Sequence, residues 1–345
     1  MNMIKVGVVR GGISSEYEVS LKTGENVLSH LRGEELNHKY TPIDILIDKN
    51  GIWHIGGLET TLEKVFHKVD VVFNALHGDF GEDGKFQQIL EQWKIPYTGS
   101  GPLASSLGYN KAMAKEVFTS LGIKTPKHIL FPAYLEDIDS NIDDGKNEEE
   151  HKKEYAIKKA GEVFKKFSPP WIVKPLTGGS SMGVHMCKTL PDLIKAFELG
   201  ANKEVSVIVE ELIEGKEATV GVINNFRGQN VYVLPPIEIR VPKSFKFFDY
   251  EAKYSGKSEE ICPGCFKKEE KIELERLASL IHSGLNLSHY SRSDFIVHPK
   301  KGIYALEVNT LPGLTNESLI PKGLRAVGAS VPEFIDHLIT LALKK

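Results

Sequence analysis

The feature that most constrains the fold is a predicted β-hairpin inside the stretch from Arg292 to Leu319. An apolar strand at 295–297 leads into a turn at 299–302, made of proline, two lysines and glycine, residues that break strands and tolerate tight bends. A second strand follows at 303–308. Strands joined by so short a turn pair antiparallel, so the position of the turn sets which residues face one another.

The expected register brings four polar side chains together on this hairpin. With the turn centred between residues 300 and 301, Asp294 lies opposite Glu307 and Arg292 lies opposite Asn309. Side chains alternate between the two faces of a strand, so all four share one face. Oxygen ligands on rigid strands suit Mg²⁺, and an arginine beside them can neutralise charge on a phosphoryl group or an oxyanion. The alternative is an ordinary surface hairpin, which poorly explains carboxylates in an apolar strand, because burying them without a cation is costly.

Composition indicates a globular protein of two or three domains without a broad nucleic-acid surface. The chain has 345 residues, of which 41 % are hydrophobic and 26 % charged, and its net charge is −3. We expect no membrane partner, because the N-terminus has no signal pattern and the apolar runs are too short to span a bilayer. Three cysteines indicate a reducing, cytoplasmic compartment. Cys262 and Cys265 form a C-P-G-C motif, which is the pattern of half a zinc site or of a redox pair, but the absence of a second pair disfavours both.

Two segments near the N-terminus share the pattern of a strand, a glycine-rich turn and the start of a helix. The first has a strand at 4–9 and a helix that carries Glu16, and the second has a strand at 70–76 followed by His77. The pattern is Rossmann-like, but G-x-G-x-x-G is missing, which disfavours a dinucleotide site. Glu16 either complements the helix dipole or holds an ammonium group at the end of the sheet. His77 is either a substrate-binding group or an ordinary loop residue.

The middle of the chain contains candidate contacts for a nucleotide. A strand that ends near Lys174 leads into a loop at 177–183 rich in glycine and serine. This loop either lays backbone N–H groups on phosphate oxygens or is a plain hairpin turn. A strand at 205–209 is followed by Glu210 and Glu211, whose carboxylates can accept hydrogen bonds from an adenine amino group and ribose hydroxyls.

Helical patterns account for most of the remaining sequence. We expect a helix at 103–121 with Lys111 near its middle, an amphipathic helix at 269–287 beneath the site, and a terminal helix at 331–343. The segment at 136–166 is highly charged with both signs, which indicates a solvated loop leading into an exposed helix.

The segment at 242–262 is long and has little regular pattern. Long loops of this kind are either functional lids or disordered. Its aromatic residues, together with Lys253 and Tyr254, favour a lid that closes over a site.

Six segments carry a resemblance to a known family: G-G-I-S-S-E-Y-E-V-S-L, A-L-H-G-D-F-G-E-D-G, P-Y-T-G-S-G, V-K-P-L-T-G-G-S-S-M-G-V, D-Y-E-A-K-Y and L-E-V-N-T-L-P-G-L-T-N-E-S-L-I-P. In this order and spacing, the chain resembles the D-alanine–D-alanine ligases of the ATP-grasp superfamily over essentially its whole length. The resemblance implies an α/β fold, with α+β character in the C-terminal half. A Rossmann-like domain at 1–101 would precede a central ATP-grasp subdomain at 102–209 and a C-terminal subdomain at 210–345, which holds the lid and the metal site.

The activity that the resemblance implies is ATP-dependent ligation of two D-alanine molecules through an acyl phosphate, for peptidoglycan precursor synthesis. Two Mg²⁺ ions, or Mn²⁺ in their place, would accompany ATP. A homodimer joined through the N-terminal domain is also implied.

On the amino-acid side, the resemblance implies that Glu16 receives the ammonium group of the first D-alanine, with His77 nearby. Ser180 and Tyr254 would hydrogen-bond with Glu16 to close the site. Tyrosine at 254 also favours an amine over a hydroxy acid as the second substrate. The other residues implied here are Arg292 and the N–H of Gly313 for the oxyanion, and Ser318 and Leu319 for the carboxylate of the second D-alanine.

On the nucleotide side, the implied contacts fall into three groups. They are Lys111, Lys174, Ser180, Ser181 and Lys253 for the phosphates, Glu210, Glu211, Ile213 and Glu217 for adenine and ribose, and Asp294, Glu307 and Asn309 for the metal ions.

Three other functions stay open on the sequence. One is an ATP-grasp ligase that joins D-alanine to another amino or hydroxy acid. Another is a nucleotide-binding module without ligase activity, which the complete set of polar residues disfavours. The third is a Rossmann-type oxidoreductase, which the missing G-x-G-x-x-G disfavours.

Overall fold

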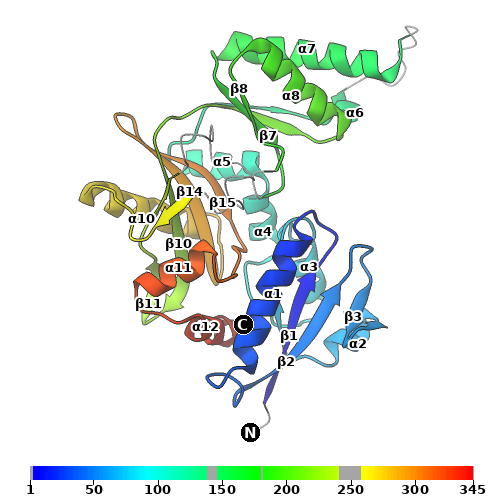
Figure 1. Cartoon of the computed structure of the whole chain (residues 1–345), viewed down its shortest axis with the longest axis vertical. Helices are drawn as coiled ribbons and strands as arrows, with labels where there is room; N and C mark the ends of the chain where they lie inside the picture. The colour runs from blue at the N-terminus through cyan, green and yellow to red at the C-terminus, as the bar shows by residue number, and fades with distance from the viewer. Residues whose placement is uncertain (1–2, 138–145, 180–181, 241–257, 345) are drawn as a thin grey trace.

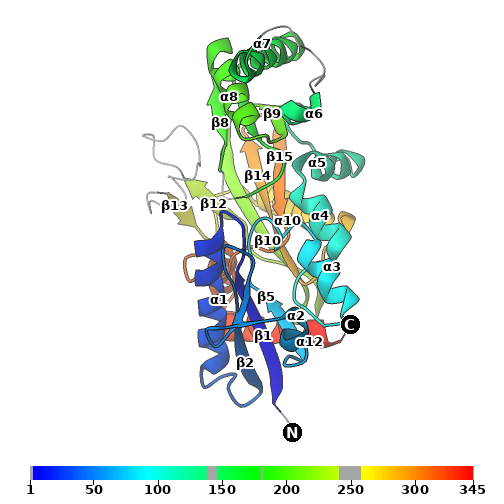
Figure 2. The same cartoon turned by 90° about the vertical axis from the view of Figure 1, so that its right-hand side faces the viewer.

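Three β-sheets follow one another along the long axis of the molecule (Figures 1 and 2). The computed structural model describes residues 3–137, 146–179, 182–240 and 258–344. A four-stranded sheet lies at one end, a five-stranded N-terminal sheet at the other, and a six-stranded sheet between them. This mixture of sheets and covering helices is the α/β architecture that the sequence predicts.

The N-terminal sheet is the Rossmann-like part of the fold. Its strand order is β4-β3-β2-β1-β5, with β1 parallel to both β2 and β5 and with β3 and β4 antiparallel at the edge. The apolar residues of β1 and β5 are buried, as expected for central strands covered by helices. The elements are β1 (Ile4–Gly11), α1 (Tyr17–Arg32), β2 (Tyr40–Ile47), β3 (Trp53–Ile55), β4 (Leu58–Thr60), α2 (Leu62–Phe66), β5 (Val71–Asn74) and α3 (Lys85–Gln92).

The four-stranded sheet is antiparallel throughout, in the order β6-β9-β7-β8, and it has a hydrophobic core of its own. Two helices, α7 and α8, pack together on this sheet and contribute Val163 and Phe197 to that core. The elements are β6 (His128–Phe131), α6 (Tyr134–Asp137), α7 (Glu148–Lys166), β7 (Trp171–Pro175), β8 (His185–Cys187), α8 (Leu190–Asn202) and β9 (Val207–Glu211).

The six-stranded sheet is also antiparallel, in the order β13-β12-β10-β14-β15 with β11 paired to β10. One face carries α10 and α5. The elements are α4 (Pro102–Tyr109), α5 (Lys111–Ser120), β10 (Lys216–Phe226), β11 (Gln229–Val233), β12 (Ile237–Arg240), β13 (Glu259–Ile261), α10 (Lys268–Gly284), β14 (Tyr290–His298), β15 (Gly302–Asn309), α11 (Leu319–Ala326) and α12 (Val331–Leu343).

The N-terminal sheet and the six-stranded sheet share one hydrophobic core, although they come from opposite ends of the chain. The C-terminal helix α12 makes this link, because it packs against α1 and β5. Its Phe334 is fully buried and lies edge-to-face on Tyr290, the first residue of β14, with ring centroids 5.4 Å apart. Both views place α12 beside the N-terminal sheet (Figures 1 and 2).

Two helix predictions need correction. The expected helix at 103–121 is two helices, because Asn110 leaves helical geometry and its side chain accepts a hydrogen bond from Met113 N as the N-cap of α5. Lys111 therefore lies at the start of a helix and not near the middle of one. The helix expected within the segment at 136–166 is less exposed than predicted, since α7 buries Tyr155, Ala156 and Val163. About three apolar residues in every seven are enough to form a buried stripe along a helix, so the many charged residues around them concealed this pattern in the sequence.

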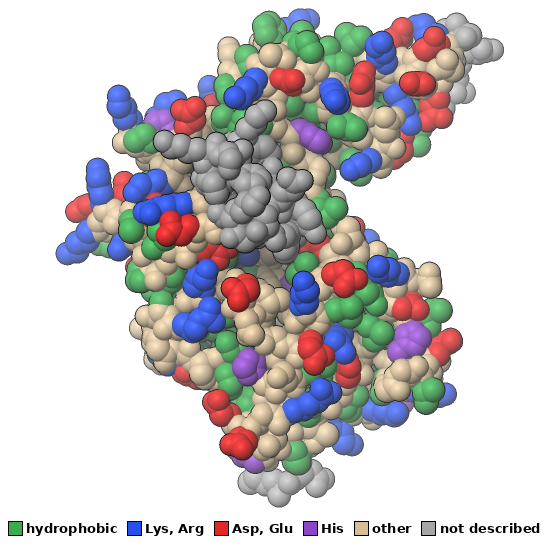
Figure 3. All heavy atoms as spheres, viewed as in Figure 1, with side chains coloured by type: hydrophobic (Ala, Val, Ile, Leu, Met, Phe, Trp, Pro, Cys, Tyr) green, Lys and Arg blue, Asp and Glu red, His purple; other side chains and the backbone are tan. Residues whose placement is uncertain are grey.

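No single helix in the described ranges has the length and hydropathy to cross a membrane, whereas α11 and α12, bent by 108°, meet that test of length and composition only as a pair. The face in Figure 3 carries acidic and basic side chains interspersed, with no broad basic area. The same view shows a hollow in the outline between the upper and lower parts of the molecule.

Candidate functional site

The β14–β15 hairpin has the predicted register at the site, but the turn is centred one half-step earlier than expected. His298 pairs with Gly302, which centres the turn on Lys300 and gives Gly302 a φ of +89°. A β-bulge between Asp294 and Phe295 then adds one residue on β15. Beyond the bulge the pairs are the predicted ones: Asp294 with Glu307 and Arg292 with Asn309.

Asp294 is held by two neighbours on this sheet. Arg292 Nε and Nη2 each donate to one of its carboxylate oxygens at 3.0 Å, and the Thr219 hydroxyl on β10 donates to Oδ1 at 2.5 Å. Burial alone would lower the pKa of Arg292, but the carboxylates of Asp294 and then Glu307 outweigh it and raise that pKa. Arg292 is therefore a permanent cation beside two carboxylates.

The oxygen donors of the hairpin fit a magnesium ion. Two carboxylates and one amide come from neighbouring antiparallel strands and share a face, which is the donor chemistry that Mg²⁺ prefers. Asn309 Oδ1 already accepts a hydrogen bond from Leu311 N at 2.8 Å, which fixes the orientation of the amide. Such outer hydrogen bonds are typical of metal-ligating side chains.

Next to the hairpin, three charged side chains from three elements form a buried cluster. Lys174 Nζ on β7 and Lys115 Nζ on α5 both lie 3.0 Å from the same atom, Glu210 Oε1 on β9. All three are nearly inaccessible, and Lys115 is fully buried. The approach directions do not meet hydrogen-bond geometry at Oε1, so both contacts are ion pairs.

The charge states in this cluster follow from burial and pairing. Burial would raise the pKa of Glu210, but the two ammonium groups outweigh it and the pKa is lowered, so the carboxylate is ionised. Burial lowers the pKa of Lys115 to about 8 despite Glu210. Burial also acts downward on Lys174, but Glu210, Glu307 and Asp294 together raise its pKa.

The break between α4 and α5 connects the glycine-rich loop to the rest of the site. Lys111, the first residue of α5, donates from Nζ to Gly178 O at 2.6 Å and from its backbone N to Leu176 O at 3.0 Å. Lys111 and Lys115 are one helical turn apart, so both point from α5 toward the four-stranded sheet. The glycine-rich loop is therefore hydrogen-bonded, through Gly178, to Lys111, one of the lysines predicted to bind phosphate.

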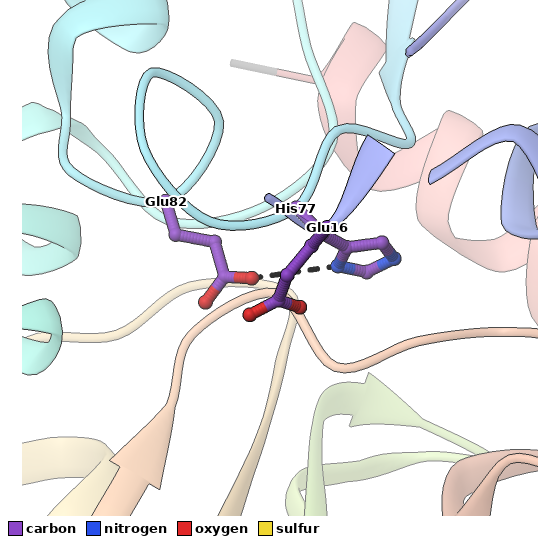
Figure 4. Close-up of side chains that lie close together, drawn as sticks. All are labelled: Glu16, His77 and Glu82. Atoms are coloured by element: carbon purple, nitrogen blue, oxygen red, sulfur yellow. Dashed lines mark hydrogen bonds and ion pairs between the residues drawn. The ribbon is translucent and has the colours of Figure 1, made fainter. Parts of the chain in front are cut away.

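Across the site, Glu16, His77 and Glu82 form a buried acidic cluster in which ligand atoms of all three residues lie within 4.8 Å of one another. Figure 4 shows the two carboxylates pointing to the same side, with the imidazole beside them. His77 Nδ1 lies 3.4 Å from Glu82 Oε1, and Nε2 lies 3.0 Å from Thr23 Oγ1. Two carboxylates around one small space suit an ammonium group or a metal cation.

Glu16 is the N-cap residue of α1, but its side chain makes no capping hydrogen bond and is buried instead. This favours the ammonium interpretation of Glu16 over the helix-dipole one. The glycine-rich loop meets it there, because a Cβ on Gly179 would lie 2.6 Å from Glu16 Oε1. A Cβ on Gly313 would lie 3.2 Å from Ser318 Oγ and 3.8 Å from His77 Nε2, so these three residues adjoin the same space.

The structure therefore brings most of the predicted residues to one region, with a difference at Glu211. Ser318 Oγ accepts from Thr315 N at 3.0 Å, while Leu319 and Arg292 adjoin one narrow gap that is too small for a water molecule. Glu211 follows Glu210 on β9, and neighbouring residues on a strand face opposite sides. Its carboxylate accepts from Lys127 N at 3.0 Å, outside the lysine cluster. Ile213 follows β9, and Glu217 lies on β10 opposite Ile296.

Four predicted residues lie outside the described part of the chain: Ser180, Ser181, Lys253 and Tyr254. The expected lid at 242–262 also lies outside the described residues, except for 258–262, which include β13.

Sequence reasoning missed three residues of this site: Glu82, Lys115 and Thr219. Glu82 had a signal, because it lies in the glycine-rich loop directly after His77. Lys115 is four residues after Lys111, and a helix places such a pair on one face. No sequence pattern marked Thr219, because a single threonine in an apolar strand is common and its pairing with Asp294 on β14 appears only in the structure.

Comparisons with known proteins agree with this geometry. The family model described as "D-ala D-ala ligase C-terminus" matches residues 145–340, and "D-ala D-ala ligase N-terminus" matches 55–100. A D-alanine–D-alanine ligase from Carboxydothermus hydrogenoformans is 37 % identical, with 99 % of each chain covered. One from Clostridium botulinum strain Alaska E43 is 36 % identical, covering 99 % of each chain.

Solved structures give the same result for the fold. A D-alanine–D-alanine ligase from Bacillus anthracis, complexed with ATP, matches with a TM-score of 0.76 and 29 % identity, covering 100 % of this chain and 98 % of that one. VanG, a D-Ala:D-Ser ligase from Enterococcus faecalis, matches with a TM-score of 0.79 and 29 % identity, covering 99 % and 100 %.

Proposed function

The chain belongs to the D-alanine–D-alanine ligase family, and we propose that it joins two D-alanine molecules with the conversion of ATP to ADP and phosphate. The observation that carries this proposal is the meeting of two unlike sites at Gly179. On one side lies the acidic cluster of Glu16 and Glu82, and on the other lie the lysines and the carboxylate hairpin. A substrate with an ammonium group at one end and a carboxylate at the other fits between them.

In the first step, a carboxylate oxygen of the first D-alanine attacks the γ-phosphorus of ATP, and ADP leaves. Glu16 holds the ammonium group of this D-alanine, and we add Glu82 as a second acceptor because it adjoins the same space. Lys111 and Lys174 neutralise phosphate charge, with Lys253 and the loop serines Ser180 and Ser181 in the roles that the family resemblance implies.

In the second step, the neutral amine of the second D-alanine attacks the carbonyl carbon of the acyl phosphate. Phosphate leaves and takes up the proton that the nitrogen loses. Arg292 and the backbone N–H of Gly313 stabilise the oxyanion that forms. Ser318 and Leu319 hold the carboxylate of the second D-alanine. The proposed lid, with Tyr254, excludes water that would otherwise hydrolyse the acyl phosphate.

Two metal ions, Mg²⁺ or Mn²⁺, would be held by Asp294, Glu307 and Asn309, whose oxygen donors fit them. Bound there, they would supply positive charge for the phosphates of ATP. Glu210, Glu211, Ile213 and Glu217 are the proposed contacts for adenine and ribose, although the carboxylate of Glu211 faces the opposite side of β9 from that of Glu210.

The biological setting is proposed from the same relationship. The dipeptide would enter peptidoglycan precursor synthesis, and the reaction would take place in the cytoplasm, which three free cysteines support. We also propose a homodimer through the N-terminal domain. For the proposed division at 101 and 209, the end of the N-terminal sheet supports the first limit, whereas α4 and α5 pack on the six-stranded sheet and β9 extends past the second limit to Glu211.

Phosphate release tests this proposal and its main alternative. D-Alanine, L-alanine, D-lactate and D-serine are each supplied with ATP and Mg²⁺, alone and together with D-alanine, and the products are weighed by mass spectrometry. Release with D-alanine alone, together with the dipeptide, is the expected result. Release only with a mixed pair would support a ligase with a different second substrate, as in the VanG neighbour. ATP binding without release would contradict ligase activity.

A further inference from the structure

A fully buried lysine, Lys115, adjoins the proposed nucleotide site without a role in the steps above. Its Nζ donates to Thr125 Oγ1 at 2.8 Å and lies 3.0 Å from Glu210 Oε1. Burying an ammonium group is costly unless a partner compensates for the lost hydration. Glu210 is that partner, but Glu210 is shared with Lys174, whose Nζ lies at the same distance from the same oxygen.

Because two lysines share one glutamate, the cluster keeps a net positive charge. Lys115 and Lys174 contribute two positive charges and Glu210 one negative charge, so the cluster is a net monocation. If Lys115 were absent, Glu210 and Lys174 would form a neutral buried pair, and each would be the other's sole ionic partner within the cluster. A neutral pair attracts phosphate less strongly than a monocation does, and moving Lys174 would leave Glu210 buried without a counter-ion.

We propose that Lys115 is a positioning residue. Its ammonium group neutralises the carboxylate of Glu210, so that Lys174 can turn from Glu210 to the phosphates of ATP. This inference rests on the proposed function, in which Lys174 binds phosphate. Three elements fix the arrangement. The α5 helix carries Lys115, and the adjacent strands β7 and β9 carry Lys174 and Glu210 on one face of their sheet.

The test compares ATP binding in three variants: Lys115→Met, Glu210→Gln and the double variant. Calorimetric titration with ATP and Mg²⁺, without D-alanine, measures binding independently of ligation. Lys115→Met makes the cluster neutral and should weaken ATP binding by about tenfold or more. Adding Glu210→Gln restores the single positive charge and keeps an amide oxygen in place. The double variant should therefore bind ATP more tightly than Lys115→Met alone, while the single variant Glu210→Gln measures how much binding is lost through the proposed contact of Glu210 with adenine.

A matched control separates this role from general stability. Lys159 on α7 is another nearly buried lysine in the same four-stranded part, paired with Asp137 at 2.8 Å and away from the site. Lys159→Met should lower the melting temperature while leaving the dissociation constant for ATP within about twofold of the parent.

Two results would overturn the proposal. One is unchanged ATP binding by Lys115→Met. The other is a double variant that binds ATP no better than Lys115→Met, which would make Lys115 a purely structural residue. Failure of the proposed function gives a different result. The parent and its variants would then bind ATP with the predicted order of affinities, but the parent would form no dipeptide. A parent that does not bind ATP would refute both.

Discussion

At the scale of single residues, the site depends on how closely two parts of the molecule approach each other. The φ angle of Gly179 lies outside the left-handed region, so the backbone conformation alone does not require glycine here. What requires glycine is the carboxylate of Glu16, 2.6 Å from where a Cβ would be. That carboxylate is the end of a flexible side chain and can move, so the consequence of a substitution falls on substrate binding and not on folding.

Gly179→Ala tests this reasoning. The new methyl group should displace the Glu16 carboxylate and raise the KM for D-alanine by about tenfold, because small misplacements near reacting groups are costly. The free energy of unfolding should change by no more than about 0.5 kcal/mol. Steady-state kinetics and urea unfolding measure the two effects. Gly161→Ala on α7, where a Cβ meets open space, is the control and should leave KM unchanged.

A second prediction concerns His282, which is buried between Ser291 and Asn224 on the six-stranded sheet. Burial lowers its pKa from 6.5 to about 4, because the charged imidazolium is disfavoured there. Its folded pKa lies below its unfolded pKa, so its contribution to stability is complete above pH 6.5. That contribution is lost as the pH falls toward 4, by up to about 3 kcal/mol.

Urea unfolding at pH 7.5 and pH 5 measures this effect. Burial also lowers the pKa values of two partly buried histidines, His30 and His185, which act in the same direction. The parent is therefore compared with His282→Gln, in which the pH dependence should be smaller. An equal loss of stability in parent and variant between these pH values would show that His282 is not the group responsible.

At the scale of elements, the hairpin shows how much the sequence could predict and why. Its two strands and the pairs Asp294–Glu307 and Arg292–Asn309 followed from the turn and the alternation of side chains. The bulge at Asp294 did not, because one extra residue in a strand leaves no mark in an apolar pattern. The predicted pairs are right because the bulge offsets the half-step error in the centre of the turn.

The break at Asn110 was missed for a different reason. The residues from 103 to 121 keep a helical pattern through the break, and asparagine is a cap only when the backbone leaves the helix. In the structure this cap sets the start of α5, and so the place of Lys111 and Lys115.

Asn110→Ala should therefore affect both stability and the nucleotide site. Loss of the cap costs about 1 kcal/mol, and freedom at the first turn of α5 should raise the KM for ATP severalfold through Lys111. Ser330→Ala is the matched control, because Ser330 caps α12 by the same kind of hydrogen bond, to Glu333 N at 3.1 Å, far from the lysines. It should cost similar stability with no change in this KM. Equal kinetic effects of the two variants would contradict a role for the cap in positioning Lys111.

At the scale of the whole molecule, the two ends of the chain fold together. α12 connects the N-terminal sheet to the six-stranded sheet in one core, whereas the four-stranded sheet has a core of its own. The sequence predicted α12 itself, since its apolar period, Ser330 and Pro332 mark a helix start. Which sheet it covers was not predictable, because a buried helix of this kind is apolar enough to pack on either one.

Phe334→Ala tests the shared core. Deleting this fully buried ring, which packs on Tyr290, should cost about 3–5 kcal/mol. Hydrogen exchange should accelerate in β1 and β5 as well as in β14, while β7 and β9 change less. Phe164→Ala, at a 56 % exposed position on α7, is the control and should cost far less. Faster exchange confined to α12 would contradict a single cooperative core.

The proposed reaction has one signature at the level of atoms. If the carboxylate of the first D-alanine attacks ATP, the oxygen that bonds to phosphorus must leave with the phosphate. D-Alanine labelled with ¹⁸O in both carboxylate positions is therefore supplied with ATP and Mg²⁺, and the released phosphate is weighed by mass spectrometry. The account predicts one ¹⁸O atom in the phosphate for each dipeptide formed. Unlabelled phosphate would mean that water, and not the substrate carboxylate, attacks ATP, and would contradict the acyl phosphate mechanism.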